Sequence, residues 1–248
     1  MIQLYNGDCL EVMPAHVADH SVDLIVCDPP YGTTTINWDK TLPLDALWAE
    51  YRRVLKPTGT VILFGSQPFT SDLVVSNRKW FKYCLVWDKN KCGSPGLAKI
   101  RPMKTHEDIV VFAPSRTTYN PQMEAGEPYQ RKSKRAEGYA PRCNEHGYGF
   151  KPLAEIVNAG TRYPKSVLKI PRDFSAQQQI HPTQKPVALM KWLILTYSNP
   201  GDTVLDNTMG VGATGMAAKE TGRNFVGIEL GPKYFALAQE RIANHPAA

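Results

Sequence analysis

Short apolar runs alternate with segments of helical periodicity along most of this chain of 248 residues. A short run that is apolar throughout is typical of a parallel strand buried on both faces. Because parallel strands are joined by crossover helices, the alternation predicts an α/β domain with a mostly parallel, doubly wound sheet. The first part contains predicted strand 22–28, helix 44–55, strand 60–65, helix 68–77 and β-rich runs 80–88 and 108–113, and the last part contains helix 186–198, strand 203–206, helix 213–221, strand 225–229 and helix 233–243.

Residues 115–165 differ in composition from the segments on either side. They hold nine Lys/Arg against five Glu, an excess of four that accounts for most of the net charge of +6. Aromatic residues alternate with Gly and Pro, and aliphatic residues are few, so this segment cannot bury much core by itself. We therefore predict one main domain, 1–114 with 166–248, and a small irregular insertion at 115–165. The insertion is either a solvated loop region or a surface that contacts phosphates and stacks on bases.

The tetrapeptide Asp28-Pro29-Pro30-Tyr31 ends and follows the predicted strand 22–28. Open α/β sheets bind ligands at the carboxyl ends of their strands. The two prolines fix the backbone and lack N–H donors, so a carboxylate, a rigid carbonyl and an aromatic ring are presented together. This set suits a flat ring that bears an amine, because the oxygens accept from NH₂ while the tyrosine stacks on the ring. The alternative is a proline turn that carries a surface tyrosine.

A second candidate site begins in segment 204–215, which predicts a strand, a glycine turn and the start of a helix. Gly210, Gly212 and Gly215 fit the GxGxxG pattern, and such glycines let the backbone approach a ligand closely. The next predicted strand ends in Glu229, 19 positions after Gly210 (229 − 210), where an acid holds ribose hydroxyls. The segment therefore predicts a nucleotide site, and a dinucleotide cofactor is one alternative.

Two features argue against a dinucleotide. Asp206 lies four positions before Gly210, where its carboxylate repels a pyrophosphate but suits a positively charged ligand end, such as the amino-acid moiety of S-adenosylmethionine. Only 43 residues run from Asp206 to Ala248 (248 − 206 + 1), too few to complete a doubly wound sheet. We expect strands 22–28 and 60–65 to supply the other half, which places the Asp28 turn beside the nucleotide site.

These motifs and their order resemble the β-group of amino-directed DNA methyltransferases of the DPPY type, and the likeness covers nearly the whole chain. Asn6-Gly7-Asp8-Cys9-Leu10 resembles the family's N-terminal cofactor motif. His181-Pro182-Thr183-Gln184-Lys185-Pro186 matches the segment before the helix that covers the cofactor. Asp206 to Gly212 corresponds to the family's DPFxGSG motif, although Asn207-Thr208-Met209 replaces Pro-Phe-x here and Val211 replaces the serine.

The resemblance implies a Rossmann-like methyltransferase fold with permuted motif order. The reaction it implies is methyl transfer from S-adenosylmethionine to the exocyclic amino nitrogen of a base flipped out of double-stranded DNA. Members that act on cytosine more often have a serine in place of Asp28, so N6 of adenine is expected. The roles implied are catalytic for Asp28, Pro29, Pro30 and Tyr31, and cofactor-binding for Asp8, Cys9, Asp28, Lys185, Pro186, Asp206, Thr208, Gly210, Gly212, Thr214 and Glu229.

The same resemblance makes 1–114 and 166–248 one catalytic domain and 115–165 a target-recognition region. Its basic residues are expected to contact DNA: Arg116, Arg131, Lys132, Lys134, Arg135 and Arg142. His106, Glu107 and the segment 89–96 resemble positions near the target base, and the alternative for His106 is a structural role. Members of the family often dimerise, but no segment marks an interface, and the sequence does not identify a restriction endonuclease partner.

Composition narrows the setting. The five cysteines include no CxxC pair and the six histidines are scattered, so no metal site is expected, and a reducing compartment is favoured. The sequence has no apolar run of membrane-spanning length and no signal peptide, so we expect a cytoplasmic protein of a bacterial or phage-infected cell. Cytosine, RNA or a side-chain amide as target, a dinucleotide-dependent oxidoreductase and a non-catalytic DNA-binding protein remain as alternatives.

Overall fold

The computed structural model describes residues 1–32, 41–90, 95–132, 155–172 and 184–247. The chain forms two compact units, which we call the main unit (Met1–Asn120 with Lys165–Ala248) and the small unit (Pro121–Pro164). Among the described residues, no helix is both long and apolar enough to cross a membrane.

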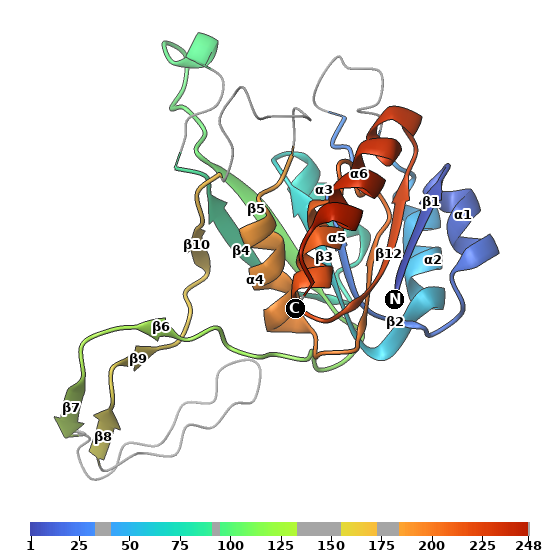
Figure 1. The fold of residues 1–248 in the computed structure, drawn as a ribbon. Helices are drawn as coiled ribbons and strands as arrows, with labels where there is room; N and C mark the ends of the chain where they lie inside the picture. The colour runs from blue at the N-terminus through green and yellow to red at the C-terminus, as the bar shows by residue number, and fades with distance from the viewer. Residues whose placement is uncertain (33–40, 91–94, 133–154, 173–183, 248) are drawn as a thin grey trace. The chain divides into compact units, whose positions relative to one another are not determined.

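The described part of the main unit contains an eight-stranded sheet with the order β1-β12-β11-β2-β3-β5-β4-β10 (Figure 1). Its strands are β1 (Ile2–Asn6), β2 (Val22–Cys27), β3 (Leu55–Gly65), β4 (Phe81–Asp88), β5 (His106–Phe112), β10 (Val167–Lys169), β11 (Thr203–Asp206) and β12 (Asn224–Glu229). Neighbours from β1 to β3 pair in parallel, and β10 is parallel to β4, whereas β5 is antiparallel to both β3 and β4. The prediction of a mostly parallel sheet is confirmed.

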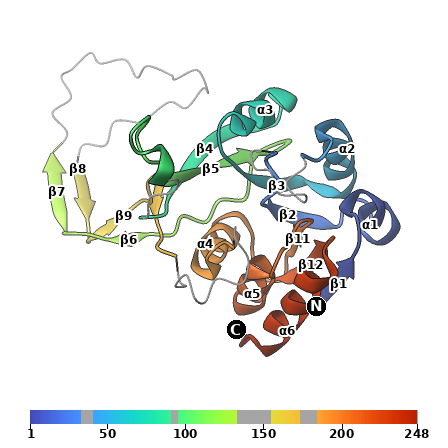
Figure 2. The same cartoon turned by 90° about the horizontal axis from the view of Figure 1, so that it is seen from above.

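Helices cover both faces of this sheet, as Figure 2 shows. Their bounds are α1 (Cys9–His16), α2 (Leu44–Val54), α3 (Phe69–Ser76), α4 (Val187–Tyr197), α5 (Ala213–Glu220) and α6 (Pro232–Asn244), with a short 3₁₀ turn η1 (Pro95–Leu97). Residues of β2 alternate between the two cores: Leu24 and Val26 pack with α4 and α5, and Ile25 and Cys27 with α1 and α2. The sheet is therefore doubly wound, because each central strand buries both of its faces.

The centre of the sheet joins the two ends of the sequence. β11 lies beside β2, with Val204 opposite Leu24 and Leu205 opposite Ile25. From β2 the chain continues through α2 to β3, whereas from β11 it continues through α5 to β12 in the opposite direction and over the other face. The carboxyl ends of β2 and β11 thus form a topological switch point, where open α/β sheets bind their ligands. This arrangement confirms the expected permuted order.

Most predicted elements of the main unit are present within one or two residues of their expected bounds, but one strand begins earlier than expected and three elements were not predicted. β3 begins at Leu55 rather than at residue 60, because Leu55 already pairs with Val22 before a register shift. The elements that were not predicted from the sequence are β1, α1 and the three-residue strand β10. α1 contains Pro14 and shows little amphipathic patterning, so its helical signal is weak.

The small unit consists of two short antiparallel ladders in its described part. β6 (Glu124–Ala125) pairs with β9 (Thr161–Arg162), and β7 (Tyr129–Lys132) pairs with β8 (Glu155–Asn158). None of its described side chains is buried. Within the unit, the Arg162 guanidinium lies 4.7 Å from the centroid of the Tyr129 ring. Polar and cation–π contacts of this kind, rather than a hydrophobic core, characterise its described residues.

Candidate active site

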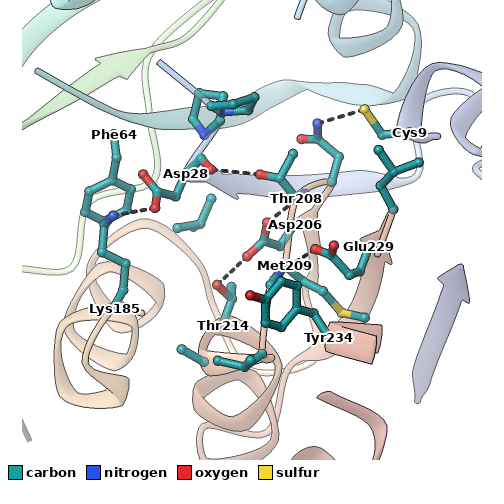
Figure 3. A pocket seen from close by; sticks show the side chains of 18 of the residues that line it. Cys9, Asp28, Phe64, Lys185, Asp206, Thr208, Met209, Thr214, Glu229 and Tyr234 are labelled. Carbon is teal, nitrogen blue, oxygen red and sulfur yellow. Dashed lines mark hydrogen bonds and ion pairs between the residues drawn. The ribbon is translucent and has the colours of Figure 1, made fainter. Parts of the chain in front are cut away.

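A cavity of about 550 Å³ lies at the carboxyl ends of β2 and β11 (Figure 3). The Asp28 turn forms one part of its wall, and the glycine turn that follows β11 forms another. Its volume falls within the range of small-molecule sites, roughly 300–1,000 Å³. All the described residues that line it belong to the main unit.

The Asp28 carboxylate is held by two donors. The Tyr31 hydroxyl donates to Asp28 Oδ1 at 2.6 Å, and Lys185 Nζ donates to Oδ2. The Tyr31 ring stacks on Phe69, with centroids 5.4 Å apart. One face of the tyrosine is therefore already covered by protein, so only the opposite face is left for a flat ligand.

Four charged groups form a chain that begins at Asp28. Lys185, only 6% exposed, donates to Asp28 and lies 3.2 Å from Glu107 Oε2, while Lys89 Nζ lies 3.0 Å from Glu107 Oε1. Burial alone raises the pKa of Glu107, but Lys185 and Lys89 outweigh it and hold this pKa at about 2. Burial lowers the pKa of Lys185, yet its two carboxylate partners raise it above the ordinary value. The chain thus holds two positive and two negative groups.

The glycines of the turn after β11 have different functions. Gly210 has φ +54°, and a Cβ added to it meets no atom within 4 Å, so this backbone faces open space in the cavity. A Cβ at Gly212 or Gly215 instead approaches Ile242 of α6 to 2.9 and 2.5 Å. Only Gly210 therefore serves close approach to a ligand, and the other two allow α5 and α6 to pack closely.

Asp206 ends β11 and is 4% exposed. Its carboxylate accepts from the Thr214 hydroxyl at 2.6 Å and from the Thr208 amide at 3.1 Å. Burial raises its pKa to about 7, and the nearby negative charge of Asp28 acts in the same direction. An ionised carboxylate at this point of the cavity attracts the positively charged part of a ligand.

Glu229 ends β12 at another part of the cavity wall. One oxygen accepts from the Gly210 amide at 2.9 Å and the other from the Gly231 amide at 2.8 Å. Burial raises the pKa of Glu229. Since a carboxylate oxygen can accept more than one hydrogen bond, Glu229 both fixes the glycine turn and retains acceptor capacity for ligand hydroxyls.

Side chains of the glycine turn connect the two halves of the site. The Thr208 hydroxyl donates to the Asp28 carbonyl at 3.0 Å and contacts Cys27 Sγ at 3.1 Å. Asn207 accepts from the Tyr51 hydroxyl at 2.7 Å and donates to Cys9 Sγ at 3.5 Å. Asn207 and Thr208 stand where the sequence departs from the DPFxGSG pattern. These departures therefore provide buried hydrogen bonds that tie the turn to β2, α1 and α2.

The structure brings most of the predicted site residues to the cavity. The predicted residues that line it are Asp8, Cys9, Asp28, Pro29, Pro30, Tyr31, Lys185, Asp206, Thr208, Gly210, Thr214 and Glu229. Two predicted cofactor contacts are absent from the lining: Pro186 is the N-cap of α4, and Gly212 is the N-cap of α5. Of the conspicuous hexapeptide, His181, Pro182 and Thr183 lie outside the described residues.

The predicted DNA-contacting residues lie elsewhere. Arg116 is exposed in the main unit, and the backbones of Arg131 and Lys132 belong to β7. Lys134, Arg135 and Arg142 lie outside the described residues. His106 is exposed and does not line the cavity, whereas Glu107 does.

Several lining residues were not predicted from the sequence, among them Phe64, Met190 and Tyr234. The ion pair of Lys185 with Asp28 was not predicted either, because no local pattern signals a contact between residues 157 positions apart. Of these residues, Phe64 was the easiest to predict, because it lies near the carboxyl end of an apolar strand that runs towards the same end of the sheet.

The residues present fit S-adenosylmethionine. Gly210 leaves room for close approach, Asp206 supplies an anionic wall for the cationic part, and Glu229 supplies acceptors for hydroxyls. Among the described residues, no cluster of three or more potential metal ligands occurs.

Comparisons with known proteins agree with this geometry. The model of a family described as DNA methylase matches residues 22–240. Type II methyltransferase M.HpaI of Haemophilus parainfluenzae is 28% identical over 244 residues, 92% of this chain and 70% of that protein. DNA adenine methyltransferase YhdJ of Escherichia coli is 31% identical over 265 residues, 99% of this chain and 84% of that protein.

Solved structures give the same result at the level of the fold. The M1.HpyAVI–SAM complex superposes with a TM-score of 0.65 and 25% identity, and covers 98% of this chain and 99% of that chain. The cytosine-N4-specific PvuII DNA methyltransferase superposes with a TM-score of 0.68 and 16% identity, covering 99% of this chain and 93% of that one.

Proposed function

This chain belongs to the DNA methylase family, and from that membership we propose that it transfers a methyl group from S-adenosylmethionine to the N6 amino group of adenine in DNA. The observation that carries the proposal is the union of two motifs in one cavity. Thr208, in the turn that would hold the methyl donor, donates to the backbone of Asp28, in the turn that would hold the amine.

Asp28 and Pro29 prepare the target nitrogen. Its lone pair is delocalised into the base, so it is a poor nucleophile. Hydrogen bonds from NH₂ to the Asp28 carboxylate and the Pro29 carbonyl favour a pyramidal nitrogen with a free lone pair. When bound, S-adenosylmethionine supplies an electrophilic methyl carbon on a sulfonium sulfur. The protein contributes mainly positioning and electrostatic stabilisation.

The target base must leave the duplex to reach Asp28. The cavity lies at the carboxyl ends of the strands and is enclosed by protein on several sides. A base that is stacked within the DNA double helix therefore cannot enter it. Unstacking and unpairing cost a few kcal/mol, and stacking on an aromatic face such as that of Tyr31 returns about 1–3 kcal/mol.

Adenine is favoured over cytosine for two reasons. The first residue of the DPPY motif is an aspartate, Asp28, rather than serine. The relative with 31% identity is named an adenine methyltransferase, whereas the cytosine-N4 enzyme is only 16% identical and supports the fold alone.

We assign DNA recognition to the basic segment 115–165. Its positive charge suits the phosphate backbone, and its aromatic residues suit stacking on bases. An enzyme that modifies genomic DNA would act in the cytoplasm of a bacterial or phage-infected cell. A homodimer is a further proposal, which rests on the dimerisation that is common in this family.

A single assay tests the proposal. The protein is incubated with unmethylated duplex DNA and S-adenosylmethionine labelled in its methyl group, and the DNA is then digested to nucleosides. We expect the label in N6-methyl-2′-deoxyadenosine, with none when Asp28→Ala replaces the wild-type chain. Label in N4-methyl-2′-deoxycytidine would refute the assignment to adenine, and unlabelled DNA from the wild-type protein would refute the proposed activity.

A further inference from the structure

Lys185 lies in an unusual place for a lysine. Its side chain is 6% exposed, and its ammonium lies between two carboxylates, those of Asp28 and Glu107. A buried charge is costly unless it is paired and hydrogen-bonded, so its retention here calls for a function. Figure 3 shows the ammonium beside Asp28 and below the Phe64 ring.

The described contacts of the ammonium all lie around Asp28. Lys185 donates a hydrogen bond to Asp28 and forms an ion pair with Glu107 Oε2 at 3.2 Å. The nitrogen also lies 5.0 Å from the centroid of the Phe64 ring, within cation–π range. These contacts place the charge of Lys185 at the carboxylate that would bind the target amine.

We propose that Lys185 is a positioning residue for methyl transfer, which keeps the Asp28 carboxylate ionised and fixes its rotation towards the incoming amino group. This inference rests on the proposed function. It moves Lys185 from the cofactor site, where the sequence motif placed it, to the centre that binds the target amine.

The hydrogen bonds of Asp28 support this role. Tyr31 donates to one carboxylate oxygen and Lys185 to the other, so the carboxylate plane is fixed from both sides. Each oxygen keeps a second lone pair, which can accept from an amino group. The bonds therefore orient the acceptor without consuming it.

Electrostatics gives Lys185 a second effect. The pKa of Asp28 lies above its ordinary value: burial raises it most and Glu107 raises it further, whereas Lys185 and the hydrogen bond from Tyr31 limit the rise. Asp206 is a further carboxylate close enough to interact with Asp28. Without Lys185, two buried carboxylates would face Asp28 with no adjacent cation. Asp28 would then take up a proton at a higher pH, and the protonated oxygen would no longer accept from the amine.

The decisive measurement is the dependence of kcat on pH, together with donor affinity by calorimetry. In Lys185→Met, we expect kcat at pH 7 to fall by about tenfold or more and the acidic limb to move to higher pH by about a unit or more, since each unit is tenfold. Donor Kd should change less than about twofold, within the scatter for a group that makes no direct contact. Lys185→Arg should return the acidic limb towards its wild-type position, because it restores the charge.

Two further variants complete the design. Glu107→Gln removes a negative charge that faces Asp28 and keeps Lys185, so its acidic limb should move to lower pH, the opposite direction. Lys191→Met is the control: Lys191 lies on α4, the helix that begins just after Lys185 and Pro186, and its ammonium pairs with Glu220 at 2.8 Å and does not line the cavity. It should leave the pH profile unchanged. If Lys185→Met does not fold, the opposite shift in Glu107→Gln still tests the charge balance.

The outcomes separate this inference from the proposed function. An unshifted acidic limb in Lys185→Met, or a loss of donor affinity that accounts for the whole fall in rate, would overturn the positioning role. So would a shift of the same sign in Glu107→Gln. If the wild-type protein methylates no DNA, the proposed function fails first. If it methylates DNA and the profiles do not move, only the assignment of Lys185 fails.

Discussion

Asp28 and Asp206 end or follow neighbouring strands at the same sheet edge, yet their surroundings prepare them for different tasks. Asp28 is paired with a cation and a phenol, Lys185 and Tyr31. In the part of the chain that the structure describes, Asp206 accepts from neutral donors only, the Thr214 hydroxyl and the Thr208 amide. A paired carboxylate stays ionised as an acceptor, whereas an unpaired buried one gains most when a cationic ligand arrives.

Replacing Asp28 by Asn should abolish most methyl transfer with little effect on donor binding. The amide keeps the shape but presents NH₂ where a carboxylate oxygen should accept, and it leaves Lys185 with only one carboxylate partner. We expect kcat to fall by roughly a hundredfold or more, as for the loss of a preorganised electrostatic group. Single-turnover kinetics and donor calorimetry on the same sample check this. Turnover near the wild-type rate would contradict the proposed hydrogen bond from the target amino group to the Asp28 carboxylate.

Donor binding should weaken as the pH falls below 7. Burial raises the pKa of Asp206 to about 7, so below this pH the folded protein holds a proton that a cationic ligand must displace. Affinity is therefore fully present above pH 7 and declines below it by up to about tenfold per unit. Asp206→Asn should bind more weakly at every pH and lose this dependence, while Asp45→Asn, on the exposed face of α2, should retain it. Calorimetry between pH 5.5 and about 8 spans the window given by that pKa.

The elements around the glycine turn are packed with little tolerance. α5 passes close to β12 and α6, because Gly215 has no side chain where Phe225 and Ile242 approach. The same closeness holds the N-terminus of α5 beneath the cavity. Packing and ligand approach thus use different glycines of the turn and of the helix that follows it, and the consequences of substitution should differ.

Gly215→Ala should destabilise the fold. The added Cβ would lie 2.5 Å from Ile242 and 2.7 Å from Phe225, so helices must shift. Overpacking of this kind costs about 1–3 kcal/mol, which lowers Tm by roughly 2–12 °C for a chain of this size. Gly96→Ala, where no atom lies within 4 Å of the added carbon, is the control in thermal denaturation. Equal Tm values for the two variants would contradict the packing role of Gly215.

The sequence predicted those parts of the fold that have a local signal. The apolar runs of β2 and β11 and the acid that ends β12 were located correctly, because buried parallel strands have a distinctive composition. β1 and α1 were missed, since β1 is a half-exposed edge strand and α1 contains Pro14. The pairing of Lys185 with Asp28 depends on tertiary structure alone and left no trace in either segment.

The proposed catalytic centre and most of the predicted DNA-contacting residues belong to different compact units. The cavity belongs to the main unit, whereas four of the predicted DNA-contacting residues cluster at 131–135 within the small unit. Substitutions that remove the charges of these four residues should therefore alter DNA binding without altering the binding of the methyl donor.

Replacing Arg131, Lys132, Lys134 and Arg135 together by Gln tests this separation. If all four contact phosphates, the slope of log affinity against log salt should decrease by up to about 3.6, at roughly 0.9 per contact. Donor Kd should be unchanged. The control is a triple Gln variant at Arg78, Lys79 and Lys82, exposed cations near the start of β4, at the sheet edge opposite the cavity. Identical salt slopes for the wild-type protein and the quadruple variant would show that these four side chains do not contact DNA phosphates.

The pairing of β11 with β2 has a consequence for biosynthesis. Val204 lies opposite Leu24, and the ribosome makes it 180 residues later (204 − 24). At roughly 5–20 residues per second, β2 emerges about 10–40 s before its neighbour exists. During that interval one edge of a central strand that is apolar except for Asp23 has no partner, which is the state in which chains aggregate or recruit chaperones. Translation speed across the intervening region should therefore influence the yield of active enzyme.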